Sequence, residues 1–388
     1  MLTLRESCRL CGAGLARTLI GFEALPVAGA YVQPGSPGPV FPLNLMQCDS
    51  CGLVQLRESI DPEFYSSYRF LSGAATGYLP HLERIADAIH RLEPGAKVLE
   101  IGASDGTLLE LLRQRGLHAA GFEPAAEPAR RARERGLRVI QDFFGESTAS
   151  QCPFPAADVV VIRHVLEHID DFDPLFRGLD AVTNPQSTLI VEVPDWGETV
   201  RNRIYSNIYH IHTNYFDGKS MSALLAKYGW SICESTIVPV FSGSLYCVAR
   251  RGKAAGAVND TEDYRTFLAD WSRDIQSTRD FFDRHAAAGI RMAGYGAAER
   301  TTSLLGTAGL TALHCAVVYD ANPALTGLSL PGSGIPIRHP RDIETDRPDM
   351  LAIFARSFED EIIRQQAEYR ASGGRFVTLR KSPPEVLA

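Results

Sequence analysis

A strand–turn–helix–strand segment near the middle of the chain constrains the fold more than any other feature. Residues 97–101 (KVLEI) form an apolar run typical of a buried strand, and a turn with two glycines (GASDG, 102–106) follows. Residues 107–115 have helical periodicity, and a second apolar run at 119–122 leads into Glu123. Such a βαβ unit has parallel strands and binds ligands at their carboxyl ends. The pattern predicts an α/β fold with a doubly wound, Rossmann-like sheet.

The turn and the acidic residue after the second strand predict a bound cofactor. Gly102 and Gly106 let the backbone approach a ligand, and Glu123 is placed to accept the hydroxyls of a ribose. The spacing is ExGxxxG and not GxGxxG, which favours S-adenosylmethionine over a dinucleotide, because S-adenosylmethionine has no pyrophosphate to be held at the turn. A strand–turn–helix without a ligand is the alternative. The expected cofactor-binding residues are Glu100, Gly102, Ser104, Asp105, Gly106, Glu123, Pro124, Asp142, Phe143, Arg163 and His164.

Four of the eight cysteines lie in the first 51 residues as two CxxC pairs, Cys8 with Cys11 and Cys48 with Cys51. A glycine follows each pair, and two such turns supply the tetrahedral set of four sulfurs that Zn²⁺ prefers. Four unrelated thiols or a redox pair are the alternatives. Four protein ligands leave no open position for catalysis, so we expect a structural zinc that holds together a segment too small for its own core.

The charge of the chain limits its partners. There are 39 Lys and Arg against 46 Asp and Glu, a net charge of −7, and residues 1–75 hold five Arg, no Lys and six acidic residues. A segment that grips phosphates should be basic, so we expect no nucleic-acid partner. No apolar run reaches the ~18–20 residues of a membrane span, and the N-terminus lacks the pattern of a signal peptide. We expect a cytoplasmic chain without a membrane partner, as a monomer or a weak dimer.

Further strands continue the sheet, and histidines follow two of them. The apolar runs are 157–162 and 189–193, and the segments 230–238 and 244–250 are typical of an antiparallel hairpin that closes such a sheet. His164 and His168 follow the first run, and His210 and His212 lie in the loop after the second. Imidazole can take and give a proton at neutral pH, so His168 and His212 are candidates for acid–base catalysis. A hydrogen-bonded structural role, or a second metal site, is the alternative.

The C-terminal third has the pattern of a second, smaller α/β domain. A long helix is predicted over 261–288 and strands over 315–320, 350–355 and 376–379, the last of these closing the chain, with a helix over 359–369. The segment 291–300 repeats the strand–glycine–helix pattern, and the helix N-terminus after Gly296 is placed to hold a phosphate. Gly294 and Gly296 equally fit close packing alone. The predicted domains are 1–75 for zinc, 76–252 for S-adenosylmethionine and 253–388 for the substrate.

In this order of parts the chain resembles the bacterial sugar C-methyltransferases, which act on nucleotide-linked keto-deoxy sugars. The resemblance covers nearly the whole chain. The segments that carry it are the four cysteines, 98–106 (VLEIGASDG), 121–124 (GFEP), 209–212 (YHIH) with Tyr215 and Phe216, 294–298 (GYGAA), and 330–332 with 335–337. It implies an S-adenosylmethionine-dependent methyltransferase, a small-molecule substrate linked to a nucleotide, and His212 as the general base.

The resemblance also implies His168 in catalysis and Tyr68 at the substrate, and the remaining candidate residues are expected beside them. His168, Tyr209, His164 and His210 join His212 as catalytic candidates. The substrate-binding residues expected are Tyr68, Tyr215, Tyr246, Tyr295, Arg300 and Arg356. The chain departs from the family pattern mainly among the residues expected to contact the substrate. Ile211 stands in place of a Glu and His164 in place of an Asn, and 241–246, 299–302 and 356–357 are also changed. Methyl transfer is therefore expected with an altered substrate.

The expected reaction begins when His212 removes a proton from the carbon next to a ketone, after which that carbon attacks the sulfonium methyl group. Because Ile211 replaces a carboxylate, His212 should be a weaker base here than in the family. Methylation at O or N of a non-sugar natural product is an alternative on the same scaffold. An RNA methyltransferase and a binding role without catalysis are further alternatives, and the acidic charge disfavours the first of these.

Overall fold

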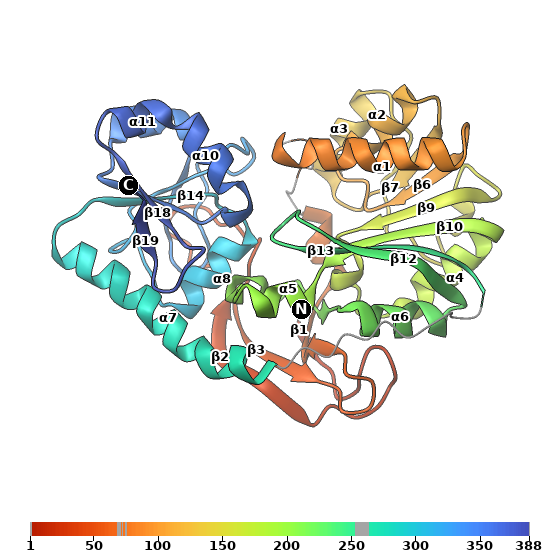
Figure 1. Cartoon of the computed structure of the whole chain (residues 1–388), viewed down its shortest axis with the longest axis horizontal. Helices are drawn as coiled ribbons and strands as arrows, with labels where there is room; N and C mark the ends of the chain where they lie inside the picture. Colours follow the sequence, from red (N-terminus) through yellow and green to blue (C-terminus); the bar gives the residue numbers. More distant parts are fainter. Residues whose placement is uncertain (1, 68–70, 72, 74–75, 253–263, 388) are drawn as a thin grey trace. The chain divides into compact units, whose positions relative to one another are not determined.

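The computed structural model describes residues 2–67, 71, 73, 76–252 and 264–387 (Figure 1). The contacts divide the chain into two units. Unit 1 is Met1–Arg17, Met46–Glu198 and Thr213–Thr261, and unit 2 is Thr18–Leu45, Thr199–His212 and Glu262–Ala388. The N-terminal segment and the loop that carries His212 therefore contribute residues to both units. The predicted boundaries at residues 75 and 252 stay predictions.

A seven-stranded sheet forms the centre of unit 1, with the order β12-β13-β10-β9-β6-β7-β8. The strands β8, β7, β6, β9 and β10 are parallel, and the hairpin of β12 and β13 closes the sheet antiparallel, as predicted. The bounds are β6 (Lys97–Ile101), β7 (His118–Phe122), β8 (Val139–Ile140), β9 (Ala157–Arg163), β10 (Thr183–Pro194), β12 (Trp230–Val238) and β13 (Ser244–Arg251). The chain order reverses between β6 and β9, so the predicted ligand site lies at a switch point of the sheet.

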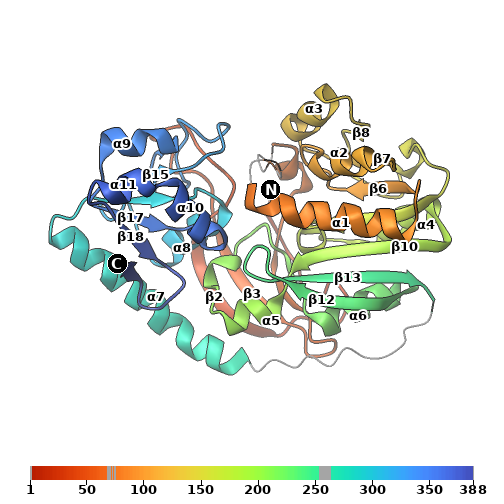
Figure 2. The same cartoon turned by 45° about the horizontal axis from the view of Figure 1, so that its top comes forward.

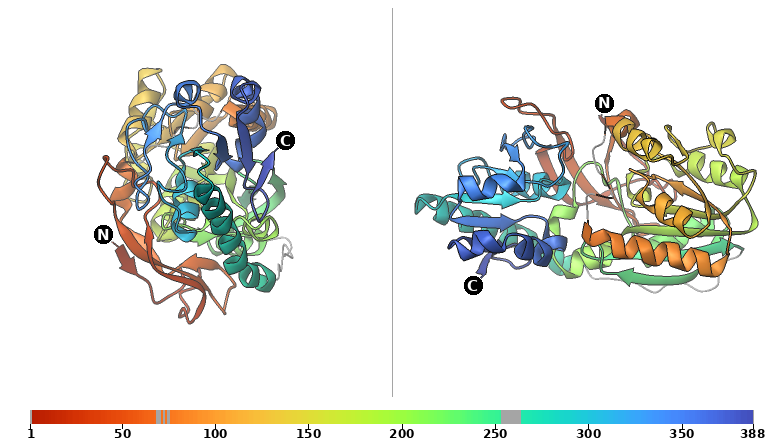
Figure 3. Two further views of the ribbon diagram at one scale, coloured as in Figure 1. Left: turned by 90° about the vertical axis from the view of Figure 1, so that its left-hand side faces the viewer. Right: turned by 90° about the horizontal axis from the view of Figure 1, so that it is seen from above.

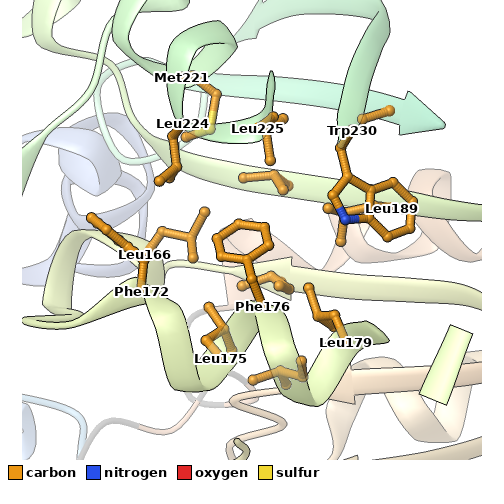
Figure 4. Close-up of a cluster of buried hydrophobic side chains, with 14 of the residues drawn as sticks. Leu166, Phe172, Leu175, Phe176, Leu179, Leu189, Met221, Leu224, Leu225 and Trp230 are labelled. Carbon is orange, nitrogen blue, oxygen red and sulfur yellow. The ribbon is translucent and has the colours of Figure 1, made fainter. Parts of the chain in front are cut away.

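Helices cover both faces of this sheet (Figures 1 and 2). Val98 and Val159 pack with α1, α2 and α3, whereas Leu99 and Val160 pack with α4 and α6. The second of these cores contains Phe172, Phe176, Met221 and Trp230 and is drawn in Figure 4. The helices are α1 (Leu79–Leu92), α2 (Thr107–Gln114), α3 (Ala126–Glu134), α4 (Phe172–Val182) and α6 (Gly218–Lys227). Strands that are buried on both faces explain the continuous apolar runs in the sequence.

Short elements complete unit 1 and the N-terminal segment. The strand β1 (Leu2–Leu4) pairs with β5 (Glu58–Ile60), and β4 (Val54–Leu56) pairs with β11 (Asn214–Tyr215). The 3₁₀ helices η1 (Pro62–Ser67) and η5 (Leu166–His168) precede α1 and α4. The helix α5 (Trp196–Arg201) spans the boundary between the units, and the hairpin strands β2 (Arg17–Pro26) and β3 (Val40–Gln47) lie mostly in unit 2.

Unit 2 contains a six-stranded sheet with the order β16-β15-β14-β17-β18-β19. Ala352 packs with α7 and α8, whereas Leu351 and Ile353 pack with α10 and α11, so helices again cover both faces (Figures 2 and 3). The bounds are β14 (Met292–Tyr295), β15 (Val318–Tyr319), β16 (Ile337–Arg338), β17 (Met350–Ile353), β18 (Arg375–Thr378), β19 (Glu385–Leu387), α7 (Tyr264–Ala287), α8 (Glu299–Thr307), α9 (Ile343–Asp346), α10 (Glu359–Gln365) and α11 (Ala367–Ala371).

Two predictions for the C-terminal third were wrong in detail. The strand at 376–379 is not the last one, because β19 follows it and pairs antiparallel with β18. The helix predicted over 359–369 is divided at Gln366, whose N–H still bonds to the carbonyl of Ile362 while its φ of −104° and ψ of 35° leave the helical region. Three consecutive polar residues, 364–366, provide no apolar contact that would favour one continuous helix. Within the described part of the chain, no helix has the length and apolar character to cross a membrane.

Candidate active site and zinc centre

The turn after β6 requires glycine at two positions. Gly102 and Gly106 both have φ of 76°, and an added Cβ would meet Val165 at 2.4 Å or Leu137 at 2.5 Å. Glycine is the residue that adopts this conformation without strain. The N–H groups of Gly102 and Ala103 both donate to the carbonyl of Phe122 at 2.9 Å, which fixes the turn against β7. The glycine positions predicted from the sequence are therefore required by the backbone.

Glu123 stands at the carboxyl end of β7, as predicted. Its carboxylate accepts hydrogen bonds from the backbone N–H groups of Ser104 and Ala125, each at 2.8 Å. Burial raises the pKa of Glu123 to about 7, although these two bonds act to lower it. Carboxylate oxygens have further lone pairs, so the two hydroxyls of a ribose can still donate to it.

This environment predicts a pH-dependent cofactor affinity. Ribose hydroxyls donate to the ionised form of Glu123, so a carboxyl that is protonated below pH 7 must release its proton when the cofactor binds. The Kd for S-adenosylmethionine should therefore rise as the pH falls below about 7. The increase in Kd should approach about tenfold for each pH unit. Calorimetry over this range measures the effect. Glu123→Gln should bind more weakly and lose this slope, and a slope that persists in the variant would contradict the ribose role.

The other predicted cofactor residues lie around the same edge. Asp142 accepts a bond from the N–H of Phe143 at 2.8 Å and from Gln151 at 3.1 Å, and the ring of Phe143 is exposed, as a surface for stacking a base would be. Pro124 precedes Ala125, the N-cap of α3. Glu100 and Arg163 are buried and form an ion pair with each other at 2.5 Å, and their part in cofactor binding stays a prediction.

The four predicted metal ligands meet at one point in unit 1. Their sulfur atoms all lie within 4.8 Å of one another, the distance expected for one tetrahedral zinc ion. In each turn the glycine after the second cysteine has positive φ, and its N–H donates to the carbonyl of the first cysteine, Gly12 to Cys8 and Gly52 to Cys48. The donor set and the shared geometry of the two turns fit zinc.

Arg9, inside the first CxxC turn, joins this centre to unit 1, and the sequence analysis did not identify it. Its side chain is fully buried and forms an ion pair with Asp170 at 2.8 Å. The same guanidinium donates to the carbonyl of Glu58 at 3.0 Å and to the hydroxyl of Ser59 at 2.6 Å. Gln55 donates to the sulfur of Cys8 at 3.0 Å and accepts from the N–H of Arg9. The zinc centre is thus bonded to the loop after η5.

His168, a predicted catalytic residue, is the last residue of η5 and directly precedes that loop. The ring of His168 packs against the ring of Tyr65 at 5.3 Å between centroids. Asn214 donates to the carbonyls of Leu166 and Ile169, and Thr213 donates to the carbonyl of Glu167. These bonds fix the carboxyl edge of β9. They tie it to the two residues that directly follow His212 in the chain.

In unit 2, His212 belongs to a chain of hydrogen bonds. The hydroxyl of Tyr209 and Nε2 of His212 are 2.7 Å apart, and the two rings lie 4.1 Å apart. Arg300 is hydrogen-bonded to Tyr209; burial lowers the pKa of this guanidinium, and the bond to Tyr209 offsets part of the effect. Tyr209 orients the imidazole of His212, and Arg300 holds Tyr209. The structure thereby brings together three residues that the sequence analysis assigned to catalysis and substrate binding.

Arg300 and Arg356 stand at the switch point of the second sheet. They follow β14 and β17, neighbouring strands from which the chain continues in opposite directions across the sheet, and ligands bind at such a crevice in open α/β sheets. Burial and the positive charge of Arg300 lower the pKa of Arg356 to about 10. Each of the two guanidinium groups disfavours the charge of the other. A bound anion would stabilise the charged form of both.

The remaining predicted residues have other surroundings. His210 is buried, with Nε2 against the carbonyls of Phe41 and Pro42, and burial lowers its pKa, which favours a structural role. Tyr215 packs on Trp196. Tyr246 lies beside His81 in unit 1, and Tyr295 ends β14, where burial raises its pKa to about 12. Tyr68 lies outside the described residues. The roles of all these residues stay predictions.

Comparison with known proteins agrees with this order of parts. A zinc binding domain model matches residues 8–65, a methyltransferase domain model matches 76–235, and a C-methyltransferase C-terminal domain model matches 246–379. Magnesium protoporphyrin IX methyltransferase from Synechocystis PCC 6803 with bound S-adenosylmethionine has a TM-score of 0.35, with 16% identity over 46% of this chain and 81% of that one. The chain is an S-adenosylmethionine-dependent methyltransferase with a zinc-binding N-terminal segment.

One relative is similar over the whole chain, and others are similar over a quarter of it. The chain is a homologue of the C-methyltransferase NovU of Streptomyces niveus, with 28% identity over 410 residues that cover 99% of this chain and 97% of NovU. The ubiquinone biosynthesis O-methyltransferase of Aeromonas salmonicida is 31% identical over 102 residues, which cover 25% of this chain and 42% of that enzyme. Similarity to NovU thus includes all three predicted parts, whereas similarity to the O-methyltransferase is confined to a quarter of the chain.

Proposed function

We propose that this enzyme methylates the carbon next to the ketone of a keto sugar linked to a nucleoside diphosphate, in the biosynthesis of a natural product. The hydrogen bond between Tyr209 and His212 carries the proposal, because it orients an imidazole as a general base. The similarity to a C-methyltransferase over 99% of the chain supports methylation at carbon.

Each protein group has a defined part in this reaction. His212 takes a proton from the carbon next to the ketone, and the C–H electron pair becomes an enolate. Tyr209 holds the imidazole in position, and a positioned base contributes about 10²–10⁴-fold in rate. Bound S-adenosylmethionine supplies an electrophilic methyl group to the enolate carbon. The turn at 102–106 and Glu123 would hold the cofactor, and Asp142 and Phe143 would bind its nucleobase.

Proton removal can be tested without methyl transfer. In D₂O with S-adenosylhomocysteine, the enzyme should exchange hydrogen for deuterium at the carbon next to the ketone of thymidine diphosphate–4-keto-6-deoxyglucose. Nuclear magnetic resonance follows the exchange, and Tyr209→Phe should slow it. Methyl transfer to a substrate without any such exchange would favour the alternative reaction, methylation at O or N of a non-sugar compound.

Arg300 and Arg356 should bind the phosphates of this substrate. A guanidinium forms charge-assisted hydrogen bonds with phosphate oxygens, each worth about 1.5–3 kcal/mol, so Arg356→Ala should raise the KM about tenfold or more. Steady-state kinetics with the same sugar nucleotide measures this. Arg341→Ala is the matched control, since its side chain is 79% exposed in the same unit. An unchanged KM in Arg356→Ala would exclude the phosphate contact.

A further inference from the structure

Glu167, in η5 at the carboxyl edge of β9, is a buried carboxylate that the reaction above does not use. Its side chain is 2% exposed, and neither oxygen has a hydrogen-bond partner among the described residues. Among the described residues, one of its oxygens forms an ion pair with Nδ1 of His164 at 3.4 Å. A buried ionised group without hydrogen bonds is costly, so a carboxylate in this position is expected to meet a donor that the protein itself does not supply.

His164 is held in place by the backbone and by a second carboxylate. Its φ is 52°, a left-handed conformation, and its N–H donates to the carbonyl of Glu192 at 2.7 Å. Nε2 donates to the carboxylate of Glu192 at 2.9 Å, while Nδ1 faces Glu167. The ring of Phe241 packs edge-on against the imidazole at 4.9 Å. His164 therefore bridges two carboxylates in one fixed orientation.

Glu192 is anchored in turn by residues of α1 and the turn before it. His81 lies 2.5 Å from one oxygen of Glu192, and the hydroxyl of Tyr78 donates to the other at 3.1 Å. Arg163 donates to the oxygen of Tyr78 at 2.6 Å. The oxygens of Glu192 are thus satisfied within the protein, whereas those of Glu167 have no hydrogen-bond partner in the part of the chain that the structure describes.

Burial alone would lower the pKa of His164, but the neighbouring carboxylates of Glu167 and Glu192 outweigh burial and raise that pKa to about 9. The imidazole is therefore cationic at neutral pH. Nδ1 of this cation lies 3.4 Å from the carboxylate of Glu167.

The geometry points to Glu167 as a substrate-binding residue that accepts a hydrogen bond from a hydroxyl of the methyl acceptor, with His164 as the residue that positions it. The inference rests on the proposed function, because a hydroxylated sugar supplies such a donor. Glu167 lies beside His168, whose ring nitrogen is within 4.8 Å of its carboxylate. The hydroxyl would thus be bound at the carboxyl edge of β9, where the doubly wound fold places its ligands.

Binding to the full chain with S-adenosylhomocysteine tests the role of Glu167. The probes are thymidine diphosphate–4-keto-6-deoxyglucose and thymidine diphosphate, which lacks the sugar. Glu167→Gln should weaken binding of the sugar nucleotide about tenfold or more and leave thymidine diphosphate unchanged. Glu146→Gln, whose side chain is 61% exposed, is the matched control. Equal weakening of both probes, or of neither, would overturn the inference.

The positioning role of His164 has its own test. His164→Gly suits the left-handed backbone and removes the cation, so it should raise the KM of the sugar nucleotide more than it lowers kcat. Added imidazole should restore the KM, and pyrazole, which has the same shape and stays neutral, should not. Rescue by both compounds would mean that His164 only fills space. If the wild-type chain binds the sugar nucleotide no better than thymidine diphosphate, the proposed function fails together with the inference.

Discussion

Replacing His212 with alanine is expected to lower kcat by about 10²–10⁴-fold, the range of a positioned general base. Tyr209 orients the imidazole through a hydrogen bond of 2.7 Å, so the step that should become slower is proton removal. His212 is not among the predicted cofactor-binding residues, so the Kd for S-adenosylmethionine should change by no more than about twofold, the size of effect that a surface substitution has. Transfer of labelled methyl groups and calorimetry measure the two quantities.

A series of variants separates catalysis from folding. Tyr209→Phe keeps the ring and removes the bond to His212, so it should lower kcat less than His212→Ala does. His90→Ala, at an exposed position in α1, should have no effect. Undiminished methyl transfer by a folded His212→Ala variant would refute the assignment of the base.

Removing zinc is expected to unfold the N-terminal segment and destabilise unit 1. Cys8 and Cys48 are buried in the same core as Phe172 and Met221, so their turns are part of the apolar packing of the methyltransferase sheet. Metal binding to such a centre supplies folding free energy directly, and its loss should lower the Tm by about 10 °C or more. The ion pair between Arg9 and Asp170 should pass this destabilisation on to the loop that follows His168.

The measurement pairs metal analysis with thermal unfolding. The chain as purified should contain one zinc ion, and both a strong chelator and Cys48→Ser should lower the Tm. Cys233→Ser is the control, because this cysteine is exposed on β12 and belongs to none of the metal-ligand clusters found among the described residues. A Tm that is the same with and without bound zinc would contradict a structural role of the metal.

The sequence predicted most closely those elements that local pattern alone determines. The strands at 97–101 and 230–238 have the predicted bounds; Gly102 directly follows the first and Gly229 directly precedes the second. The two glycines of the cofactor turn and the turn within each CxxC pair have the geometry that their fixed local spacing dictates. Such features depend on neighbours in the chain and not on distant segments.

The features that the sequence did not predict depend on contacts between residues far apart in the chain. No local pattern in a single sequence indicates such contacts. Arg9 reads as an ordinary charged residue, yet it is buried against Asp170, which lies 161 positions further along the chain. The bond between His81 and Glu192 joins positions 111 apart. The strand β19 is only three residues long, and pairing with β18 rather than its own composition defines it. Glu167 could have been noticed beside His168, but its burial could not.

The product of the reaction tests the central claim most directly. The chain is incubated with S-adenosylmethionine labelled with ¹³C in the methyl group and with thymidine diphosphate–4-keto-6-deoxyglucose, and the product is examined by nuclear magnetic resonance. Methylation at carbon predicts a labelled methyl group bonded to the sugar carbon next to the ketone, together with loss of the hydrogen from that carbon. A labelled methyl group on oxygen or nitrogen, with that hydrogen retained, would contradict the account.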